Sequence, residues 1–294
     1  MISEEAQSIK DTLVRDTLND TPINEKRQDW EEFAATVKTP GHVKVESLAI
    51  SDVPCLLLRP PGCISNSVIV YIHGGGLVEG SVNTSREWCA RLALAVDQSV
   101  LSIDYPLAPE YPFPAARDDV VSVCKAVSVE TEFVLSSIGA DSSGCALALN
   151  ALLALRDSGH DAPASCFLLS PSIDFAFRGR SMELNATTDL VVASEVLEYY
   201  ATLYVGNHNP ASAEVSSLYA DLHGLPRLLI HVDDSEILFD DAVRLEQKIR
   251  RQGGVVSLVV TKGLWHVWPT WCDFPEARIA VQQIVDHILD KKSE

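Results

Sequence analysis

Residues 133–150 read FVLSSIGADSSGCALALN, an apolar run that leads into small and polar residues and then into a second apolar run. Phe133–Ile138 predicts a β-strand, and Ser143–Leu155 predicts a helix rich in small residues. A sharp turn between such elements admits only small side chains, and a serine at its centre adopts a strained conformation that exposes its hydroxyl. Ser142 is therefore a candidate nucleophile. The alternative is that Asp141 and the serines only cap the helix, a role that suits these residue types.

Apolar runs and helical patterns alternate from residue 42 to the end of the chain. Predicted strands lie at 42–50, 53–59, 68–72, 100–104, 133–138, 166–170, 228–232 and 255–260, and predicted helices at 86–96, 115–127, 143–155, 240–251 and 276–289. This alternation indicates an α/β fold with a mostly parallel sheet flanked by helices on both faces. The alternation is interrupted at about 175–222, which predicts an insertion over the sheet with a helix near 194–204.

The first 41 residues form a different kind of segment, in which charges are interleaved with apolar residues such as Leu18, Trp30 and Phe33. This pattern predicts amphipathic helices over the segment. The predicted organisation is therefore a helical N-terminal segment, 1–41, and one α/β domain, 42–294, which carries the insertion at about 175–222.

Composition restricts the classes of partner and location. The chain has 294 residues, 47% of them hydrophobic, and a formal charge of −18. An acidic surface disfavours nucleic acid and anionic membranes as partners. The start of the chain lacks the features of a signal peptide, no apolar stretch reaches membrane-spanning length, and the seven cysteines form no CxxC pair. We expect a cytoplasmic protein with reduced thiols, no membrane segment and no metal site.

A glycine run, His73-Gly74-Gly75-Gly76, follows the predicted strand 68–72. Glycines let backbone N–H groups approach a ligand closely, and such donors stabilise the oxyanion of an acyl-transfer intermediate by ~2.7–4 kcal/mol each. We expect an oxyanion hole formed by Gly74, Gly75 and Gly76 together with the N–H of Ser143. A phosphate-binding loop is the rival interpretation, but the Lys-Ser/Thr pair that it needs is missing. A plain turn is the other alternative.

One histidine stands out as the candidate base. Among the eight histidines, His266 follows the predicted strand 255–260 and lies in a loop of aromatic residues. By contrast, His231 lies inside a predicted strand, and His73 is better placed to brace the glycine run. A nucleophile, an acid and then a histidine is the order of the triad along the chain of an α/β-hydrolase.

The candidate acid lies in a segment with five carboxylates after the predicted strand 228–232. Asp233 and Asp234 stand close to the end of that strand. Asp240 and Asp241 begin the next helix and suit the positive end of its dipole. Glu236 lies between these pairs and is the preferred acid.

Taken together, these motifs make the chain resemble the hormone-sensitive-lipase-like esterases, the bacterial family IV group of α/β-hydrolases with the HGGG motif. The residues that carry the resemblance are His73–Gly76, Asp104–Glu110, Pro112–Ala116, Asp141–Gly144 and His266, with weaker matches at Ser170-Pro171, Asp174, Asn185, Asp189 and Ser216–Leu222. The resemblance spans roughly residues 42–290. It implies an eight-stranded core with a helical cap, formed by the N-terminal helices and the insertion at about 175–222.

The resemblance also supports the choice of acid, because the sequence around Glu236 matches the branch of the family that uses glutamate. Four residues depart from the usual family pattern, namely Pro106, Ala140, Cys145 and Asp233. None of them is a triad residue. The departures therefore bear on rate and substrate fit rather than on the class of reaction.

The sequence as a whole predicts a serine carboxylic-ester hydrolase of the EC 3.1.1 class, which acts through an acyl-enzyme without metal or cofactor. The expected partner is a small soluble ester with a short acyl chain, and a homodimer is left open. Candidate substrate contacts are Leu77, Val78, Val191, Tyr199 and Trp268. Hydrolysis of a lactone or an amide by the same triad is the alternative activity. A non-catalytic binding protein on the same fold is the alternative class, although such proteins typically lose the triad histidine.

Overall fold

Eight strands form one sheet in the computed structural model, which describes residues 2–129 and 131–291, and their order is β1-β2-β4-β3-β5-β6-β7-β8. The strands are β1 (Lys44–Ile50), β2 (Val53–Arg59), β3 (Ser67–Ile72), β4 (Ser99–Ile103), β5 (Val134–Asp141), β6 (Ser165–Leu169), β7 (Arg227–Asp233) and β8 (Val256–Thr261). The β1–β2 hairpin and the β2–β4 pair are antiparallel, whereas the other pairs are parallel. The predicted mostly parallel eight-stranded sheet is confirmed.

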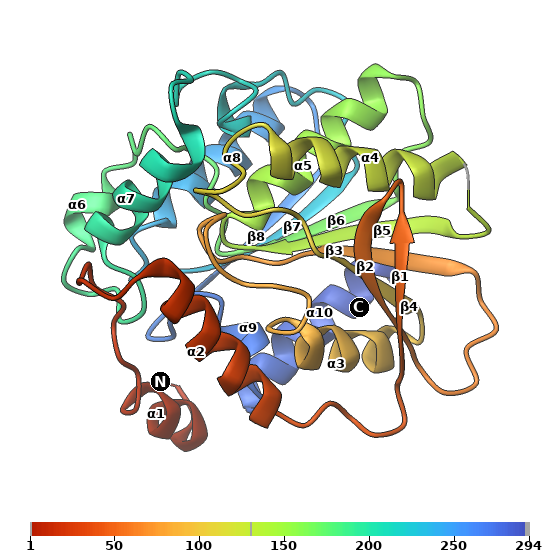
Figure 1. Cartoon of the computed structure of the whole chain (residues 1–294), viewed down its shortest axis with the longest axis horizontal. Helices are drawn as coiled ribbons and strands as arrows, with labels where there is room; N and C mark the ends of the chain where they lie inside the picture. The colour runs from red at the N-terminus through yellow and green to blue at the C-terminus, as the bar shows by residue number, and fades with distance from the viewer. Residues whose placement is uncertain (1, 130, 292–294) are drawn as a thin grey trace.

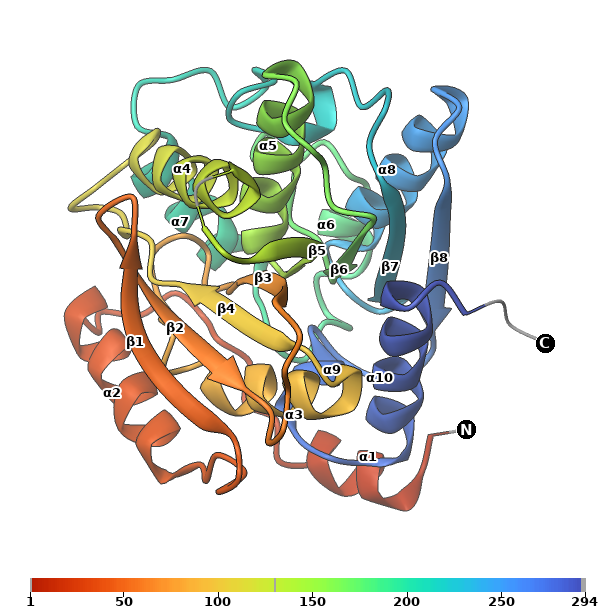
Figure 2. The same ribbon diagram turned by 90° about the vertical axis from the view of Figure 1, so that its right-hand side faces the viewer.

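Helices cover both faces of this sheet (Figure 2). One face carries α4 (Ala115–Val129), α5 (Gly144–Asp157) and α8 (Phe239–Arg251), and the other carries α3 (Arg86–Val96) and α10 (Pro275–Ile288). Because a parallel sheet is buried on both faces, its central strands have almost no polar alternation. Every residue of β4 and β6 is buried accordingly.

The elements around Ser142 differ slightly from the sequence-based prediction. The strand was expected to end at Ile138, but β5 continues to Asp141, and α5 begins at Gly144. The ladder explains the difference, because Ala140 pairs with β3 on one side and Asp141 still pairs with Leu169 of β6 on the other. Backbone pairing thus extends the strand through small residues that carry no apolar signal. As a result, Ser142 follows the strand directly.

The N-terminal segment is helical in two pieces rather than throughout. Its helices are α1 (Glu4–Lys10) and α2 (Ile23–Thr36), and the prediction of helix between them is wrong. There the chain is extended, because the backbone of Asp16 pairs with the insertion, accepting from Ala193 at 3.2 Å and donating to Val191 at 2.8 Å. At the other end of the segment, Ser3 donates from its N–H and its hydroxyl to Glu276 of α10, at 2.6 and 2.8 Å.

The insertion after β6 contains the predicted helix α7 (Ser194–Val205) and two short elements that the sequence did not reveal, α6 (Ser181–Leu184) and a 3-10 turn at Ser217–Tyr219. A further short helix, α9 (Trp268–Trp271), follows β8. We call residues 2–41 and 175–222 the cap segments. In Figure 1 their helices α2, α6 and α7 lie on the same side of the molecule. Within the described residues, no helix has both the length and the apolar character needed to cross a bilayer.

Candidate active site

Ser142 occupies the turn between β5 and α5. Its φ of 49° lies in the left-handed region, which is strained for a residue with a side chain. The turn is fixed on both sides, because the N–H of Ser142 donates to Leu169 at 2.8 Å and its carbonyl accepts from Ser172 at 3.0 Å. A side chain at Gly144 would overlap the backbone of Ile72 and His73 at the end of β3. The sequence of small residues is therefore required by the close approach of helix and sheet.

Three predicted residues come together at the carboxyl ends of β5, β7 and β8. The Nε2 atom of His266 lies 3.0 Å from the Oγ of Ser142, and its Nδ1 lies 2.8 Å from a carboxylate oxygen of Glu236. All three side chains are buried. The arrangement connects a hydroxyl, an imidazole and a carboxylate in one hydrogen-bonded row, which is the geometry that activates a serine for nucleophilic attack.

The other four carboxylates near Glu236 have different partners. Asp233 accepts hydrogen bonds from Thr261 at the end of β8 and from Leu264 in the loop that follows, and Asp234 forms an ion pair with a surface lysine. Asp240 accepts from two amides of the insertion, whereas Asp241 accepts from two amides after β6. Among the five candidates, only Glu236 therefore hydrogen-bonds His266 in the described part of the chain.

The glycine run forms a tight loop beside Ser142. Gly75 has a φ of 111° and Gly76 a φ of 64°, and the carbonyl of Gly75 accepts from the chain three and four residues later. Within residues 2–129 and 131–291, the N–H groups of Gly75, Gly76 and Ser143 donate to no protein acceptor. Gly74 lies against Asp141 and Ser142, where a side chain would overlap both residues, and its role as a donor stays a prediction. Three donors are thus available beside the hydroxyl of Ser142.

His73 supports the glycine loop through its ring and its backbone carbonyl. Its ring stacks on that of Tyr105 with centroids 4.2 Å apart, and its Nδ1 lies 2.7 Å from the carbonyl oxygen of Gly74. The hydroxyl of Tyr105 also donates to the carbonyl of His73 at 2.7 Å. Burial lowers the pKa of His73 to about 4, so the ring is neutral near pH 7. His73 therefore braces the loop, as the sequence suggested.

Known proteins share this architecture. A model of the family described as alpha/beta hydrolase fold matches residues 69–270. An esterase of Acinetobacter venetianus is 33% identical over 86% of this chain and 92% of that protein, and an acetyl-hydrolase of Streptomyces hygroscopicus is 33% identical over 73% of this chain and 72% of that protein. The crystal structure of an esterase from the bacterial hormone-sensitive lipase family matches with a TM-score of 0.92, at 33% identity and 99% coverage of both chains.

The chain belongs to the hormone-sensitive-lipase-like esterases. It is therefore a carboxylic-ester hydrolase with an α/β-hydrolase fold, and the predicted family is confirmed.

Electrostatics in the esterase couple His266 to Glu236. Burial lowers the pKa of His266, but the hydrogen bond and the charge of Glu236 outweigh this effect, so that pKa lies above its ordinary value. Burial raises the pKa of Glu236, and the hydrogen bond from His266 opposes this rise. The pair thus favours an imidazolium held by the carboxylate, which is the state that forms when a histidine takes the proton of a serine.

Ser170 connects the acid loop to the histidine loop in this esterase, and the sequence revealed it only as a weak family match. Its hydroxyl donates to Glu236 at 2.9 Å and accepts from the N–H of Val267 at 3.0 Å. Glu236 also accepts from the N–H of Asp233 at 2.7 Å. Each oxygen of the Glu236 carboxylate is therefore hydrogen-bonded, and the residue after His266 is fixed through the same serine.

The insertion also holds the acid loop of the esterase. The side-chain amide of Asn185 donates to the carbonyls of Asp234 and Glu236 at 2.9 and 2.7 Å. The carboxylate of Asp189 accepts from the N–H of Ile237 at 3.0 Å. The position of Glu236 therefore depends on cap residues as well as on the sheet.

The predicted substrate contacts lie in three places. Leu77 and Val78 are fully buried after the glycine loop, and Val191 is half-buried beside the aromatic cluster around Trp265. Trp268 is also buried, with its ring centroid 5.9 Å from that of His231. Tyr199 is 40% exposed on α7 and lines a surface cavity of about 290 Å³ between α7 and the chain before α2. The role of these five residues in binding stays a prediction.

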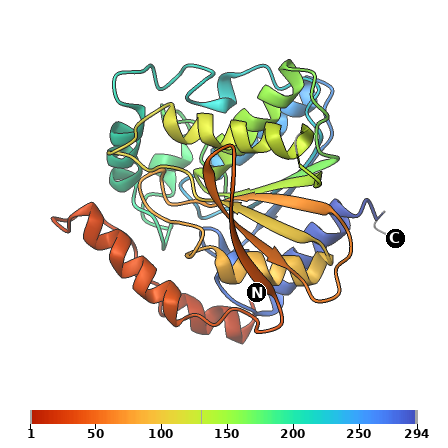
Figure 3. The same ribbon diagram turned by 45° about the vertical axis from the view of Figure 1, so that its right-hand side comes forward.

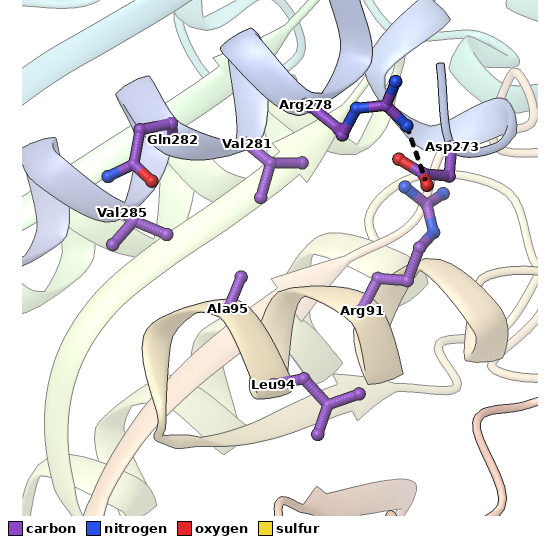
Figure 4. Close-up of a pocket in the computed structure, with 8 residues that line it drawn as sticks. All are labelled: Arg91, Leu94, Ala95, Asp273, Arg278, Val281, Gln282 and Val285. Atoms are coloured by element: carbon purple, nitrogen blue, oxygen red, sulfur yellow. Dashed lines mark ion pairs between the residues drawn. The ribbon is translucent and has the colours of Figure 1, made fainter. Parts of the chain in front are cut away.

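A second cavity of about 470 Å³ lies between α3 and α10, away from Ser142 (Figure 4). Its two arginines are already paired, Arg91 with Glu87 and Arg278 with Asp273. It therefore offers no free positive charge for an anionic ligand. Among the described residues, no cluster of histidine, cysteine and carboxylate side chains is arranged to hold a metal ion.

Proposed function

We propose that this esterase hydrolyses small esters with short acyl chains, through an acyl-enzyme formed on Ser142. The observation that carries the proposal is the row of hydrogen bonds from Ser142 through His266 to Glu236, with contacts of 3.0 and 2.8 Å. In this mechanism His266 removes the proton from the hydroxyl as it attacks the ester carbonyl. Glu236 holds the imidazole in the required tautomer and stabilises the imidazolium.

The negative charge that develops on the carbonyl oxygen is assigned to the free N–H groups of Gly75, Gly76 and Ser143. His266 then gives its proton to the leaving alcohol. A water molecule, activated by the same imidazole, attacks the acyl-enzyme and releases the carboxylic acid. In the net reaction, one water is consumed, one alcohol and one acid are released, and His266 returns to its neutral state.

The preference for short acyl chains is argued from the cap segments. The ring of Tyr200 on α7 packs against the α-carbon of Gly76, so the cap contacts the glycine loop directly. An enclosed site gains ~0.8 kcal/mol per buried CH₂ of a fitting acyl chain and then rejects longer chains by steric overlap. The name acetyl-hydrolase carried by the Streptomyces relative supports the same preference. We therefore propose acyl groups of about two to six carbons.

The test is a series of p-nitrophenyl esters from acetate to palmitate, compared by kcat/KM and accompanied by a panel of lactones. The expected maximum lies at about two to six carbons, with lactones hydrolysed more slowly. A fluorophosphonate probe should modify Ser142, and the Ser142→Ala variant should take up none. A maximum at long chains with activation at an oil–water interface would point instead to a lipase. Faster hydrolysis of lactones would support the alternative activity.

A further inference from the structure

The helix α2 is attached to the rest of the esterase mainly by polar side chains, and Ile23 at its start packs against the apolar core. Only Ala34 is buried among its fourteen residues, and Phe33 is 65% exposed. In Figure 3 this helix, drawn in red, runs along the outside of the molecule. Its polar contacts are directed at the chain that follows the glycine loop, where Glu31 accepts hydrogen bonds from Ser81 and Asn83.

Arg27 makes the most extensive of these contacts. Its Nε donates to the carbonyl of Val78 at 2.7 Å, and its Nη2 donates to the carbonyl of Ala108 at 2.6 Å. The same guanidinium forms two hydrogen bonds of 2.9 Å to the carboxylate of Glu110. The planar fork thus fixes two separate backbone segments and is itself fixed by a carboxylate.

These two backbone segments are also bonded to each other. The N–H of Ala108 donates to the carbonyl of Leu77 at 3.0 Å, and Leu77 has a φ of 63°. Such a conformation is costly for leucine and persists only where the surroundings enforce it. Arg27 therefore closes a ring of hydrogen bonds around the strained residue that directly follows Gly76.

A second cap helix, α7, contacts the same loop. On α7, the ring of Tyr200 lies against the α-carbon of Gly76, and its hydroxyl donates to the carboxylate of Glu79. The ammonium of Lys26 on α2 lies 5.8 Å from the centre of this ring. The segment Gly76–Glu79 is thus contacted by both α2 and α7.

We propose that Arg27 and Tyr200 are positioning residues that act together as a clasp on the glycine loop. The clasp holds the N–H groups of Gly75 and Gly76 at the place where the substrate oxygen develops charge. The inference rests on the proposed function of that loop. Oxyanion donors act by being fixed in place before the reaction, and a displacement of about 1 Å costs ~10²-fold in rate. The cap would therefore determine turnover as well as access to the site.

The experiment compares Arg27→Gln and Tyr200→Phe with the wild type. Active sites are first counted by stoichiometric labelling with a fluorophosphonate, so that kcat refers only to folded enzyme. We expect Arg27→Gln to lower kcat per titrated site by ~10–100-fold and Tyr200→Phe by ~3–10-fold, with KM changed by less than ~3-fold. The inhibition constant of an aryl trifluoromethyl ketone, whose adduct with Ser142 carries an oxyanion, should rise in parallel with the loss in kcat.

Arg156→Gln is the matched control. Arg156 also donates to two backbone carbonyls, those of Asp221 and His223, and pairs with a carboxylate, that of Asp157. It lies in the last turn of α5, at the opposite end of that helix from Ser142. Arg156→Gln should lower the stability of the fold by removing hydrogen bonds like those of Arg27. It should leave kcat per titrated site within ~2-fold of the wild type.

Several outcomes would overturn the clasp. An unchanged kcat per titrated site in both variants would do so, as would a loss confined to the number of sites that can be labelled. A rise in KM alone would make Arg27 and Tyr200 substrate contacts instead. An active Ser142→Ala variant would refute the proposed function itself, a result distinct from any measured on the clasp variants.

Discussion

Two helices of fourteen residues, α5 and α2, are held to this esterase by opposite means. Eleven residues of α5 are buried, but only one residue of α2 is. Burial of apolar surface stabilises without specifying direction, whereas hydrogen bonds contribute only ~0.5–1.5 kcal/mol each but fix geometry. The difference indicates that α5 supplies stability beneath the nucleophile and that α2 supplies orientation around the glycine loop. Stability and activity should therefore respond to substitutions in different places.

The largest expected effect is at Ser142, beside the buried helix α5, and it is on activity alone. Ser142→Ala should reduce ester hydrolysis by ~10⁶-fold in kcat, since loss of a triad nucleophile leaves only the contribution of the oxyanion hole and of binding. The elbow accepts alanine because it is small, so the thermal midpoint should change little. The measurement is kcat on an activated ester together with a melting curve. Retention of more than about a tenth of the activity would exclude Ser142 as the nucleophile.

The next largest effect is expected at Glu236. This residue follows β7 of the sheet, but its loop is held by Asn185 of the insertion. Glu236→Gln should lower kcat by ~10⁴-fold, since the imidazole would no longer be held in the required tautomer. The control is Asp240→Asn, assayed on the same ester.

Asp240 is a suitable control because its carboxylate accepts from two insertion amides and does not contact His266. Its variant should keep most of the activity. If Asp240→Asn were inactive and Glu236→Gln active, the acid assigned to the triad would be incorrect.

The contrast between the helices is tested directly by truncating one side chain in each. Leu152 of α5 is fully buried, so Leu152→Ala should lower the free energy of unfolding by ~2–5 kcal/mol. Phe33 of α2 is 65% exposed, and Phe33→Ala should change the free energy of unfolding by less than ~0.5 kcal/mol. Denaturant unfolding measures both. A Phe33 variant as unstable as the Leu152 variant would show that α2 also contributes to the stability of the fold.

The smallest effect concerns pH. Because Glu236 keeps the pKa of His266 above its ordinary value of 6.5, and only the neutral imidazole accepts a proton from serine, kcat/KM should fall as the pH decreases through a midpoint above 6.5. Asp234→Asn is the control, since that carboxylate pairs with Lys262 at the surface. It should leave the midpoint in place. A midpoint at or below 6.5 would show that burial dominates over the charge of Glu236.

The features that could be predicted from the sequence are those with a local signal. Apolar runs and helical patterns located the strands and the main helices, and α3 was predicted with the bounds that the structure has. Small residues around Ser142 indicated a tight turn, and loop positions after strands selected Glu236 and His266. The structure brings these three side chains together, and their catalytic roles stay predictions for the variants above.

The remaining features depend on contacts between distant parts of the chain. Ser170 joins Glu236 to Val267 only because β6 and β7 are neighbours in the sheet, which no local pattern shows. Arg27 resembles any charged residue on an exposed helix until the glycine loop is folded beside it. The extended chain at Asp16 likewise follows from pairing with the insertion rather than from its own residues.

The contact between α1 and α10 has a consequence for the order in which the protein is made. Ser3 leaves the ribosome well before its acceptor Glu276, which lies 273 residues further along the chain. At ~5–20 residues per second, the N-terminal helix waits roughly ten seconds or more for its docking site. During that time the nascent chain has neither His266 nor a docked α1. The growing chain should therefore hydrolyse no ester until both His266 and Glu276 have been synthesised.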